Sequence, residues 1–161
     1  MDGKELRRAF GQFATGITVV GVNNGDRLHG MTANSFTSVS LDPPLLLVNV
    51  IKGSNTHGLI EAAGRFAISV LTEKQQIWSD QFAGRFPEKK GVFDAPHHLG
   101  QLGQPILEGS LAWFECTLHA AYDGGDHTIF VGKVESFGTD PNAGEPLLFC
   151  NSRYQRLVPA P

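Results

Sequence analysis

Cysteine is scarce in this chain, and the patterns that bind metals are missing with it. The two cysteines, Cys116 and Cys150, lie in separate apolar, strand-like runs, with no C-x-x-C pair and no histidine at zinc spacing. We therefore expect two buried free thiols. The neighbouring His97 and His98 do not suggest a metal site either, because adjacent side chains on an extended chain point in opposite directions. The sequence predicts no metal.

Long apolar runs and an excess of positive charge are also absent. The most apolar segment, residues 45–51, is interrupted by Asn49 and is much shorter than the roughly 20 residues that cross a bilayer. Residues 1–5 contain no apolar signal core. With 13 Lys and Arg against 16 Asp and Glu, the net charge of −3 disfavours a nucleic-acid protein. We expect a cytoplasmic protein that binds neither a membrane nor nucleic acid.

The familiar nucleotide motifs are missing as well. No G-x-G-x-x-G follows a strand and opens a helix. Residues 125–133 have the wrong spacing for a P-loop, and Val134 stands where that motif needs a Ser or Thr for Mg²⁺. A dinucleotide, if bound, is not held by a Rossmann motif.

The chain has the composition of a folded globular protein. Its 161 residues, 41% of them hydrophobic, fit a single domain over residues 1–161. A first helix is expected from the capping-box pair Asp2 and Glu5 to Gly16, with an apolar face made of Leu6, Ala9, Phe10 and Phe13. Two more are expected at residues 56–63, capped by Thr56, and at 72–82, with an inward face of Ile77, Trp78, Gln81 and Phe82.

Most of the remaining sequence is strand-like. Apolar and β-branched runs predict strands through His29 and at residues 17–22, 45–51, 66–71, 111–122, 127–137 and 147–154. Residues 85–109, rich in Gly and Pro, predict a long loop with little regular structure. Many strands without β-α-β alternation favour an antiparallel sheet that closes, or nearly closes, into a barrel. The predicted fold class is mainly β with a few short helices.

The most informative segment is residues 30–44, where hydroxyl and amide side chains alternate with apolar ones and no charge precedes Asp42. One interpretation is a strand and turn whose hydroxyls bond their own backbone. The other is a wall for a large, flat, polar ligand with a phosphate, because buried hydroxyls need partners. Composition alone leaves both interpretations open.

Residues 30–44 resemble the signature segment of the flavin reductase-like family, the small NAD(P)H:flavin oxidoreductases that serve two-component monooxygenases. The resemblance continues through residues 66–71, 82–85, 125–134, 146–149 and 153–154, and covers nearly the whole chain. It implies a homodimer with an FMN-binding split β-barrel, antiparallel and Greek-key-like. It also implies hydride transfer from NADH or NADPH to N5 of FMN or FAD, with the reduced flavin passed to a monooxygenase component.

The resemblance assigns most of the site to flavin. The ring edge would lie along residues 32–36, and the ribityl chain and phosphate near residues 38–40. The turn before the second helix is a further phosphate site, because free N–H groups there favour an anion, although a plain helix cap is the alternative. Arg85 is a possible phosphate partner, and Tyr154 is either near the flavin or simply packed in its strand. The expected flavin-binding residues are Thr32, Ala33, Asn34, Ser35, Phe36, Ser38, Val39, Ser40, Gly53, Ser54, Asn55, Thr56, Phe82, Ala83, Arg85 and Tyr154.

Gly125, Asp126 and His127 are expected to bind NAD(P)H. The resemblance places His127 beside the nicotinamide, and the glycines before it let a ligand approach the backbone; an ordinary hairpin histidine is the alternative. No side chain is expected to act as acid or base, since the flavin accepts the hydride and the protein positions the two rings. The absence of an arginine cluster for a 2′-phosphate favours NADH.

Two other functions are open on the sequence alone. The protein could hold FMN for storage, sensing or electron transfer without turning over NAD(P)H, or it could reduce a different acceptor, such as a cobalt corrinoid or a metal chelate. The NAD(P)H site expected at residues 125–127 favours the flavin reductase over storage, because a storage protein needs no second nucleotide site. The sequence does not distinguish FMN from FAD or identify the partner oxygenase.

Overall fold

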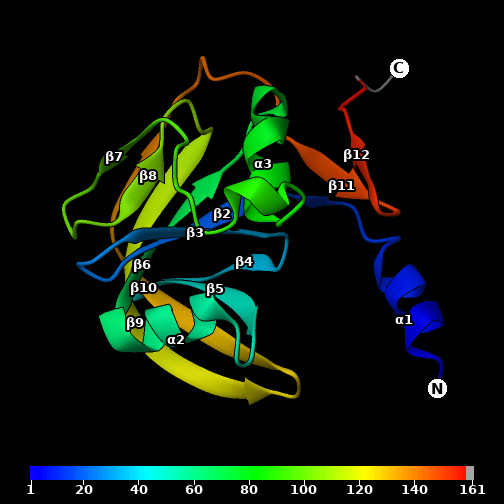
Figure 1. Cartoon of the computed structure of the whole chain (residues 1–161), viewed down its shortest axis with the longest axis horizontal. Helices are drawn as coiled ribbons and strands as arrows, with labels where there is room; N and C mark the ends of the chain where they lie inside the picture. Colours follow the sequence, from blue (N-terminus) through cyan, green and yellow to red (C-terminus); the bar gives the residue numbers. More distant parts are fainter. Residues whose placement is uncertain (159–161) are drawn as a thin grey trace.

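The chain folds into a mainly β structure, seen here in a computed structural model that describes residues 1–158. Its main element is a seven-stranded antiparallel sheet in the order β3-β2-β6-β9-β10-β5-β4 (Figure 1). The strands of this sheet are β2 (Thr18–Asn23), β3 (Leu28–Ala33), β4 (Phe36–Leu41), β5 (Pro44–Ile51), β6 (Arg65–Val70), β9 (Ala112–Gly124) and β10 (His127–Thr139). Two small sheets accompany it, made of β1 (Thr15–Gly16), β11 (Leu148–Cys150) and β12 (Arg153–Gln155), and of β7 (His97–Leu99) and β8 (Pro105–Leu107).

The seven-stranded sheet curls into a barrel that is open along one seam. Strands β3 and β4 are its opposite edges, yet only Asn34 and Ser35 join them. The Cα atoms of Ala33 and Phe36 are therefore at most about 11 Å apart, so the sheet must curl until its edges meet. The two edges do not pair with each other in the sheet. The expected split β-barrel is confirmed.

Alternate residues of the strands fill the barrel. On β5, Leu46, Val48 and Val50 are buried, so the residues between them, including Asn49, lie on the outer face. The helix α2 (Asn55–Ala63) adds Ile60 to this core. A second core packs against α3 (Gln76–Phe82) and consists of Ile17, Val19, Leu71, Ala95, Leu107 and Leu147.

The first helix is shorter than predicted and lies on the surface. Asp2 caps α1 (Gly3–Phe10) by accepting a hydrogen bond from the N–H of Lys4 at 2.8 Å, as expected. The helix ends at Gly11 rather than Gly16, because glycine is a poor helix former. None of its residues is buried, and it stands beside the barrel (Figure 1).

The cap of α2 is Ser54, so the prediction that Thr56 caps this helix is wrong. The hydroxyl of Ser54 accepts a hydrogen bond from the N–H of His57 at 3.3 Å. Thr56 lies one position inside the helix, is buried, and contacts Nε2 of His29 at 2.8 Å. Burial, and then the charge of Arg27, lower the pKa of His29, which keeps this imidazole neutral at neutral pH. The register of α2 is set by the faces that it buries.

The third helix begins as predicted. Thr72 and Gln75 form a reciprocal capping box before the 3₁₀ turn η1 (Glu73–Gln75), and α3 follows directly. Ile77, expected to face inward, is 53% exposed. The other three residues of the predicted inner face are confirmed, because Gln81 is buried and Trp78 and Phe82 pack against the second core. Ser79, which was not predicted to face inward, is buried as well and hydrogen-bonds to Tyr154.

The prediction of an irregular loop at residues 85–109 is wrong. The segment contains the 3₁₀ turn η2 (Pro87–Lys89) and the β7–β8 hairpin, and Pro105–Leu107 is buried throughout. His97 and His98 lie in β7 and contact different aromatic rings, Phe93 and Trp113, which confirms that they diverge.

This segment is anchored by Glu115 of β9, a fully buried carboxylate. It accepts hydrogen bonds from the N–H groups of Leu102 at 3.0 Å and Gln104 at 3.2 Å. The hydroxyl of Ser136 donates a third at 2.9 Å. The partner that orders the segment thus lies on a distant strand, which explains why local composition did not show it.

The C-terminal strand predicted at residues 147–154 is in fact the hairpin of β11 and β12. The chain reverses at Asn151 and Ser152, whose φ angles of 53° and 60° are left-handed.

Cys150 is half-buried rather than buried, whereas Cys116 is buried as expected; both are free thiols. Burial raises the pKa of Cys116 to about 12, so its thiol is not reactive at neutral pH.

Within residues 1–158, no helix is long and apolar enough to span a membrane. The same residues contain no group of three or more His, Cys, Asp and Glu side chains placed to hold a metal ion.

Candidate functional site

A first cavity at the seam, here called the Arg85 pocket, has a volume of about 130 Å³. It lies between the end of β3, the C-terminal end of α3 and the β11–β12 hairpin. Its walls are Ile17, Thr32, Asn34, Ser79, Ala83, Arg85, Phe149 and Tyr154. Five of these residues were expected at the flavin site: Thr32, Asn34, Ala83, Arg85 and Tyr154. The structure brings them together from three distant segments.

Hydrogen bonds hold the walls of the Arg85 pocket in place. The Thr32 hydroxyl donates to the carbonyl of Ser79 at 2.7 Å, and the Ser79 hydroxyl lies 2.9 Å from that of Tyr154. Tyr154 donates to Oδ1 of Asp80 at 2.6 Å, and Nη1 of Arg85 lies 2.9 Å from the same oxygen. Burial, and then the hydrogen bond to Asp80, raise the pKa of Tyr154, so its hydroxyl stays protonated.

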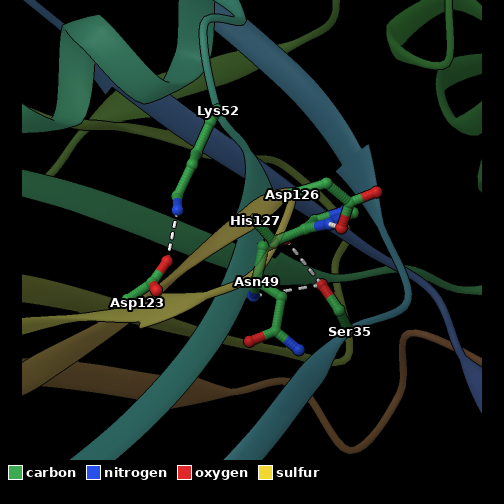
Figure 2. Close-up of polar contacts among 6 residues, drawn as sticks. All are labelled: Ser35, Asn49, Lys52, Asp123, Asp126 and His127. Atoms are coloured by element: carbon green, nitrogen blue, oxygen red, sulfur yellow. Dashed lines mark hydrogen bonds and ion pairs between the residues drawn. The ribbon is translucent and has the colours of Figure 1, made fainter.

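A second, larger cavity, the His127 groove, lies between α1 and the outer face of β5 and β10. Its volume is about 640 Å³, within the range of ligand pockets, and its walls are Gly3, Leu6, Arg7, Phe10, Ser35, Asn49, Gly124, Asp126, His127 and Ile129. Ser35 lies across a strand from the hairpin of His127 (Figure 2). Its hydroxyl donates to the carbonyl of Asn49 at 2.9 Å and accepts from the N–H of Asn49 at 3.2 Å. This side chain continues the pairing of β5 at the point where β4 begins.

The two cavities meet at the seam of the barrel. Asn34 lines the Arg85 pocket and Ser35, the next residue, lines the His127 groove. The link between β3 and β4, here called the partition, therefore contributes one residue to the wall of each cavity.

Asn49 was not predicted as a site residue. Its Oδ1 atom is buried but has no hydrogen-bond partner within the described part of the chain, and its register partner on β10 is Ile129, another wall of the groove. A buried amide oxygen without a partner is costly, so it is a natural acceptor for a ligand N–H. The sequence did hold a signal, because Asn49 is the one polar residue in the apolar run 45–51.

The tip of the β9–β10 hairpin is tied to the turn that precedes α2. The N–H of Lys52 donates to the carbonyl of Asp126 at 3.0 Å, and the Lys52 ammonium pairs with Asp123 (Figure 2). Oδ1 of Asp126 lies 2.6 Å from Nδ1 of His127, and this hydrogen bond lowers the pKa of the Asp126 carboxyl. The expected nicotinamide residues and the expected phosphate turn are thus neighbours, a proximity that sequence spacing did not reveal.

The residues expected to bind the flavin phosphate lie in two separate parts of the structure, β4 and the turn before α2. Ser38, Val39 and Ser40 lie on β4, an edge strand, where the Ser40 hydroxyl accepts from the N–H of Asp42 at 3.2 Å. Ser38 pairs with Leu46 of β5. Leu46 is five residues, about 16 Å along the strand, from Ile51, where β5 ends and the turn before α2 begins. One phosphate cannot contact both the β4 serines and residues 53–56 of the same chain.

Three expected residues act chiefly in packing. Ala33 is buried, Phe36 stacks on Phe114 with centroids 5.9 Å apart, and Phe82 lies against Gly30, where a Cβ would come within 2.6 Å of its ring. Around the turn, Gly53 and Asn55 are exposed and Ser54 is partly buried, so this side of the helix end is accessible. Gly125 adopts a φ of 80° at the hairpin tip, a conformation that favours glycine.

These features define a split-barrel protein with two cavities that meet at the barrel seam. Residues 10–158 match the family described as "Flavin reductase like domain". The chain belongs to this family.

Relatives share both sequence and fold. The chain is 41% identical over 160 residues to the "Flavin-dependent monooxygenase, reductase subunit HsaB" of Mycobacterium tuberculosis, covering 99% of this chain and 84% of that protein. The structure of the NADH:FAD oxidoreductase SgcE6 of Streptomyces globisporus in complex with NAD and FAD fragments has a TM-score of 0.91 at 44% identity, covering 98% and 94% of the two chains. The styrene monooxygenase flavin reductase of Pseudomonas putida S12 has a TM-score of 0.85 at 40% identity, covering 98% and 99%.

Proposed function

We propose that this enzyme, one domain over residues 1–161, reduces FMN or FAD with NADH in the cytoplasm and supplies the reduced flavin to a monooxygenase. The last three of these residues lie outside the described part of the chain. The observation that carries the proposal is the partition formed by Asn34 and Ser35, which open into two different cavities. Hydride transfer needs reacting atoms about 3–3.5 Å apart, so rings bound in the two cavities would have to stack past the edge of this partition rather than through it.

The residues present fit a flavin and a nicotinamide. Thr32 and Asn34 would hold the ring edge in the Arg85 pocket, and the unpartnered Oδ1 of Asn49 would accept an amide N–H in the His127 groove. Of the two expected phosphate contacts we favour residues 53–56, because the first turn of α2 leaves N–H groups free. The flavin supplies the hydride-accepting chemistry, and the chain orients the two rings and limits water between them.

Steady-state oxidation of NADH, measured with and without added FMN or FAD, tests this function. We expect oxidation that depends on flavin and saturates with it, and weaker activity with NADPH. Tight FMN binding without NADH oxidation would instead support a storage, sensing or electron-transfer protein. Oxidation that needs a corrinoid or a metal chelate would support the other alternative.

Ser54→Ala should weaken FMN binding about three- to tenfold, because it removes a hydroxyl from the proposed phosphate turn, roughly 1 kcal/mol of hydrogen bonding. Riboflavin has no phosphate and is the control: its Kd should change much less. Both constants can be measured by quenching of flavin fluorescence. Equal losses for the two ligands would show that Ser54 acts only as the cap of α2.

We infer that the enzyme is a homodimer whose interface includes exposed apolar residues of α1 and of the outer face of the sheet, at the rim of the His127 groove, and leaves the groove itself open to NADH. Leu6 and Phe10, four residues apart on α1, are 37% and 70% exposed, and Phe13, just after the helix, is 79% exposed. Ile51 and Tyr122, on the outer face of the sheet, are also more than half exposed. A contiguous apolar face of this kind marks an interaction site, and a symmetric second copy is the commonest partner.

Light scattering coupled to size exclusion should show a dimer at micromolar concentration. Phe10→Glu should shift the protein toward the monomer, because it places a charge in the proposed interface. Leu99→Glu is the matched control, since Leu99 is 52% exposed on β7, outside the proposed interface. A wild-type monomer, or an equal effect of both variants, would contradict the proposed interface.

A further inference from the structure

Arg85 is placed to act on the flavin ring rather than on its phosphate. We propose that it is a catalytic residue that stabilises the negative charge gained by the ring on reduction. This inference rests on the proposed function, and it assigns to Arg85 a different role from the phosphate contact expected from the sequence.

The guanidinium of Arg85 is held before any ligand arrives. Its Nη1 lies 2.9 Å from Oδ1 of Asp80, and its Cζ lies 5.5 Å from the centre of the Tyr154 ring. Asp80 is itself fixed, because the Tyr154 hydroxyl donates to it at 2.6 Å and its carbonyl accepts from the backbone N–H of Arg85 at 3.0 Å. The Arg85 side chain is still 53% exposed, so part of its fork of five N–H donors is free to face a ligand.

The position of Arg85 favours the ring over the phosphate. Arg85 shares its pocket with Thr32 and Asn34, the residues expected along the ring edge. None of residues 53–56 lines that pocket, so the proposed phosphate turn lies elsewhere. Arg85 is also the only charged side chain among the described residues of the pocket wall. A flavin that reaches the α2 turn with its phosphate would present its ring to Arg85.

The positive charge of Arg85 matches the charge that the flavin ring gains on reduction. A bound flavin would supply the hydride-accepting chemistry, and a ring that has gained the hydride would carry one negative charge more than the neutral oxidised ring. Arg85 would face that additional charge. A guanidinium fixed in advance stabilises such a developing charge without reorganisation, and it interacts far less with the neutral oxidised ring.

The test compares the Kd values of oxidised FMN and of FMN reduced chemically with dithionite, under anaerobic and mildly alkaline conditions. Arg85→Gln should weaken binding of reduced FMN about tenfold more than binding of oxidised FMN. By the thermodynamic cycle, this corresponds to a potential of the bound flavin that is about 30 mV lower. Arg85→Lys keeps the charge but loses the fork, and should show part of this change. Riboflavin should show the same change in ratio as FMN, because the two share the ring.

The control is Arg156→Gln, which removes one guanidinium that is 84% exposed and 3.7 Å from Glu73, outside the pocket wall. It should leave both Kd values unchanged. Equal weakening of oxidised and reduced FMN by Arg85→Gln, with riboflavin unaffected, would overturn the proposal in favour of a phosphate contact. Unchanged Kd values would overturn it in favour of a surface ion pair.

The two proposals fail in different ways. The titrations contain no NADH and therefore test Arg85 independently of NADH oxidation. Wild-type protein that binds flavin but does not oxidise NADH would contradict the proposed function. The ratio of the two Kd values would still test the role of Arg85 in that case. Wild-type protein that binds no flavin contradicts both.

Discussion

Glu115→Ala should lower the free energy of unfolding by about 3 kcal/mol or more. The buried carboxylate accepts three hydrogen bonds, and hydrogen bonds to charged groups are worth about 1.5–3 kcal/mol each. Its loss would also leave the N–H of Gln104 without that partner in a buried position. The segment that precedes β9 would lose its anchor, and we expect the β7–β8 hairpin to open more readily than the barrel.

Urea denaturation followed by circular dichroism measures this effect as a fall in the midpoint. Glu88→Ala is the control, because Glu88 is exposed in η2 and surface substitutions usually change stability by less than about 0.5 kcal/mol. Glu115→Gln keeps the shape and one acceptor oxygen and should fall between the two. A loss below about 1 kcal/mol for Glu115→Ala would mean that packing, not the carboxylate, orders this segment.

His127→Ala should raise the KM for NADH about thirtyfold, roughly 2 kcal/mol, while the Kd for flavin changes little. His127 lines the groove on the far side of the partition from the Arg85 pocket, and its ring is oriented by Asp126 at 2.6 Å. The carbonyl of Asp126 is held in turn by the N–H of Lys52. Because Nδ1–H donates to the Asp126 carboxylate, a neutral imidazole here presents Nε2 as an acceptor for the N–H of a carboxamide.

Initial rates at varied NADH and saturating flavin give the KM, and fluorescence titration gives the flavin Kd. His98→Ala is the matched control, since His98 contacts Trp113 and lies outside both cavities. A His127→Ala enzyme with weakened flavin binding and normal NADH kinetics would show that the two cavities have the opposite occupants.

The positions of most individual strands and helices could be predicted from the sequence. Apolar and β-branched runs located β2, β5, β6, β9 and β10 to within a few residues. The capping boxes and turn residues located the starts of α1 and α3. The order of the strands in the sheet could not be predicted from these local patterns, and only the family resemblance predicted the split barrel.

The errors share a physical cause, which is that the deciding contact is distant in sequence. No sequence pattern near residues 100–107 indicates that Glu115 orders them through hydrogen bonds. Ser54 and Thr56 are both good helix caps, and the choice between them depends on Thr56 meeting His29 across the barrel. The hairpin of β11 and β12 had a local signal in Asn151 and Ser152, since asparagine tolerates left-handed backbone, but apolar residues on both sides obscured it.

The site was predicted residue by residue but not as an arrangement. The sequence identified Thr32, Asn34, Arg85 and Tyr154 separately, and the fold shows that they share one pocket. It could not show that His127 belongs to a different cavity next to the α2 turn, nor that the β4 serines lie far from that turn. The site depends on how the sheet curls, and that is not a local property.

The two-residue link between β3 and β4 makes chain length itself a constraint in this family. Most connections between strands can gain or lose residues at the surface, and the turn at residues 23–26 is one of these. Asn34 and Ser35 are constrained, because one inserted residue would either lengthen the link and move Ser35 away from Asn49 or, if absorbed into β4, reverse the facing of its side chains. The barrel diameter and the depth of both cavities would change together. Variation among such enzymes should therefore occur in the identities of these two residues and not in their number, so that substrate preference is retuned by substitution alone.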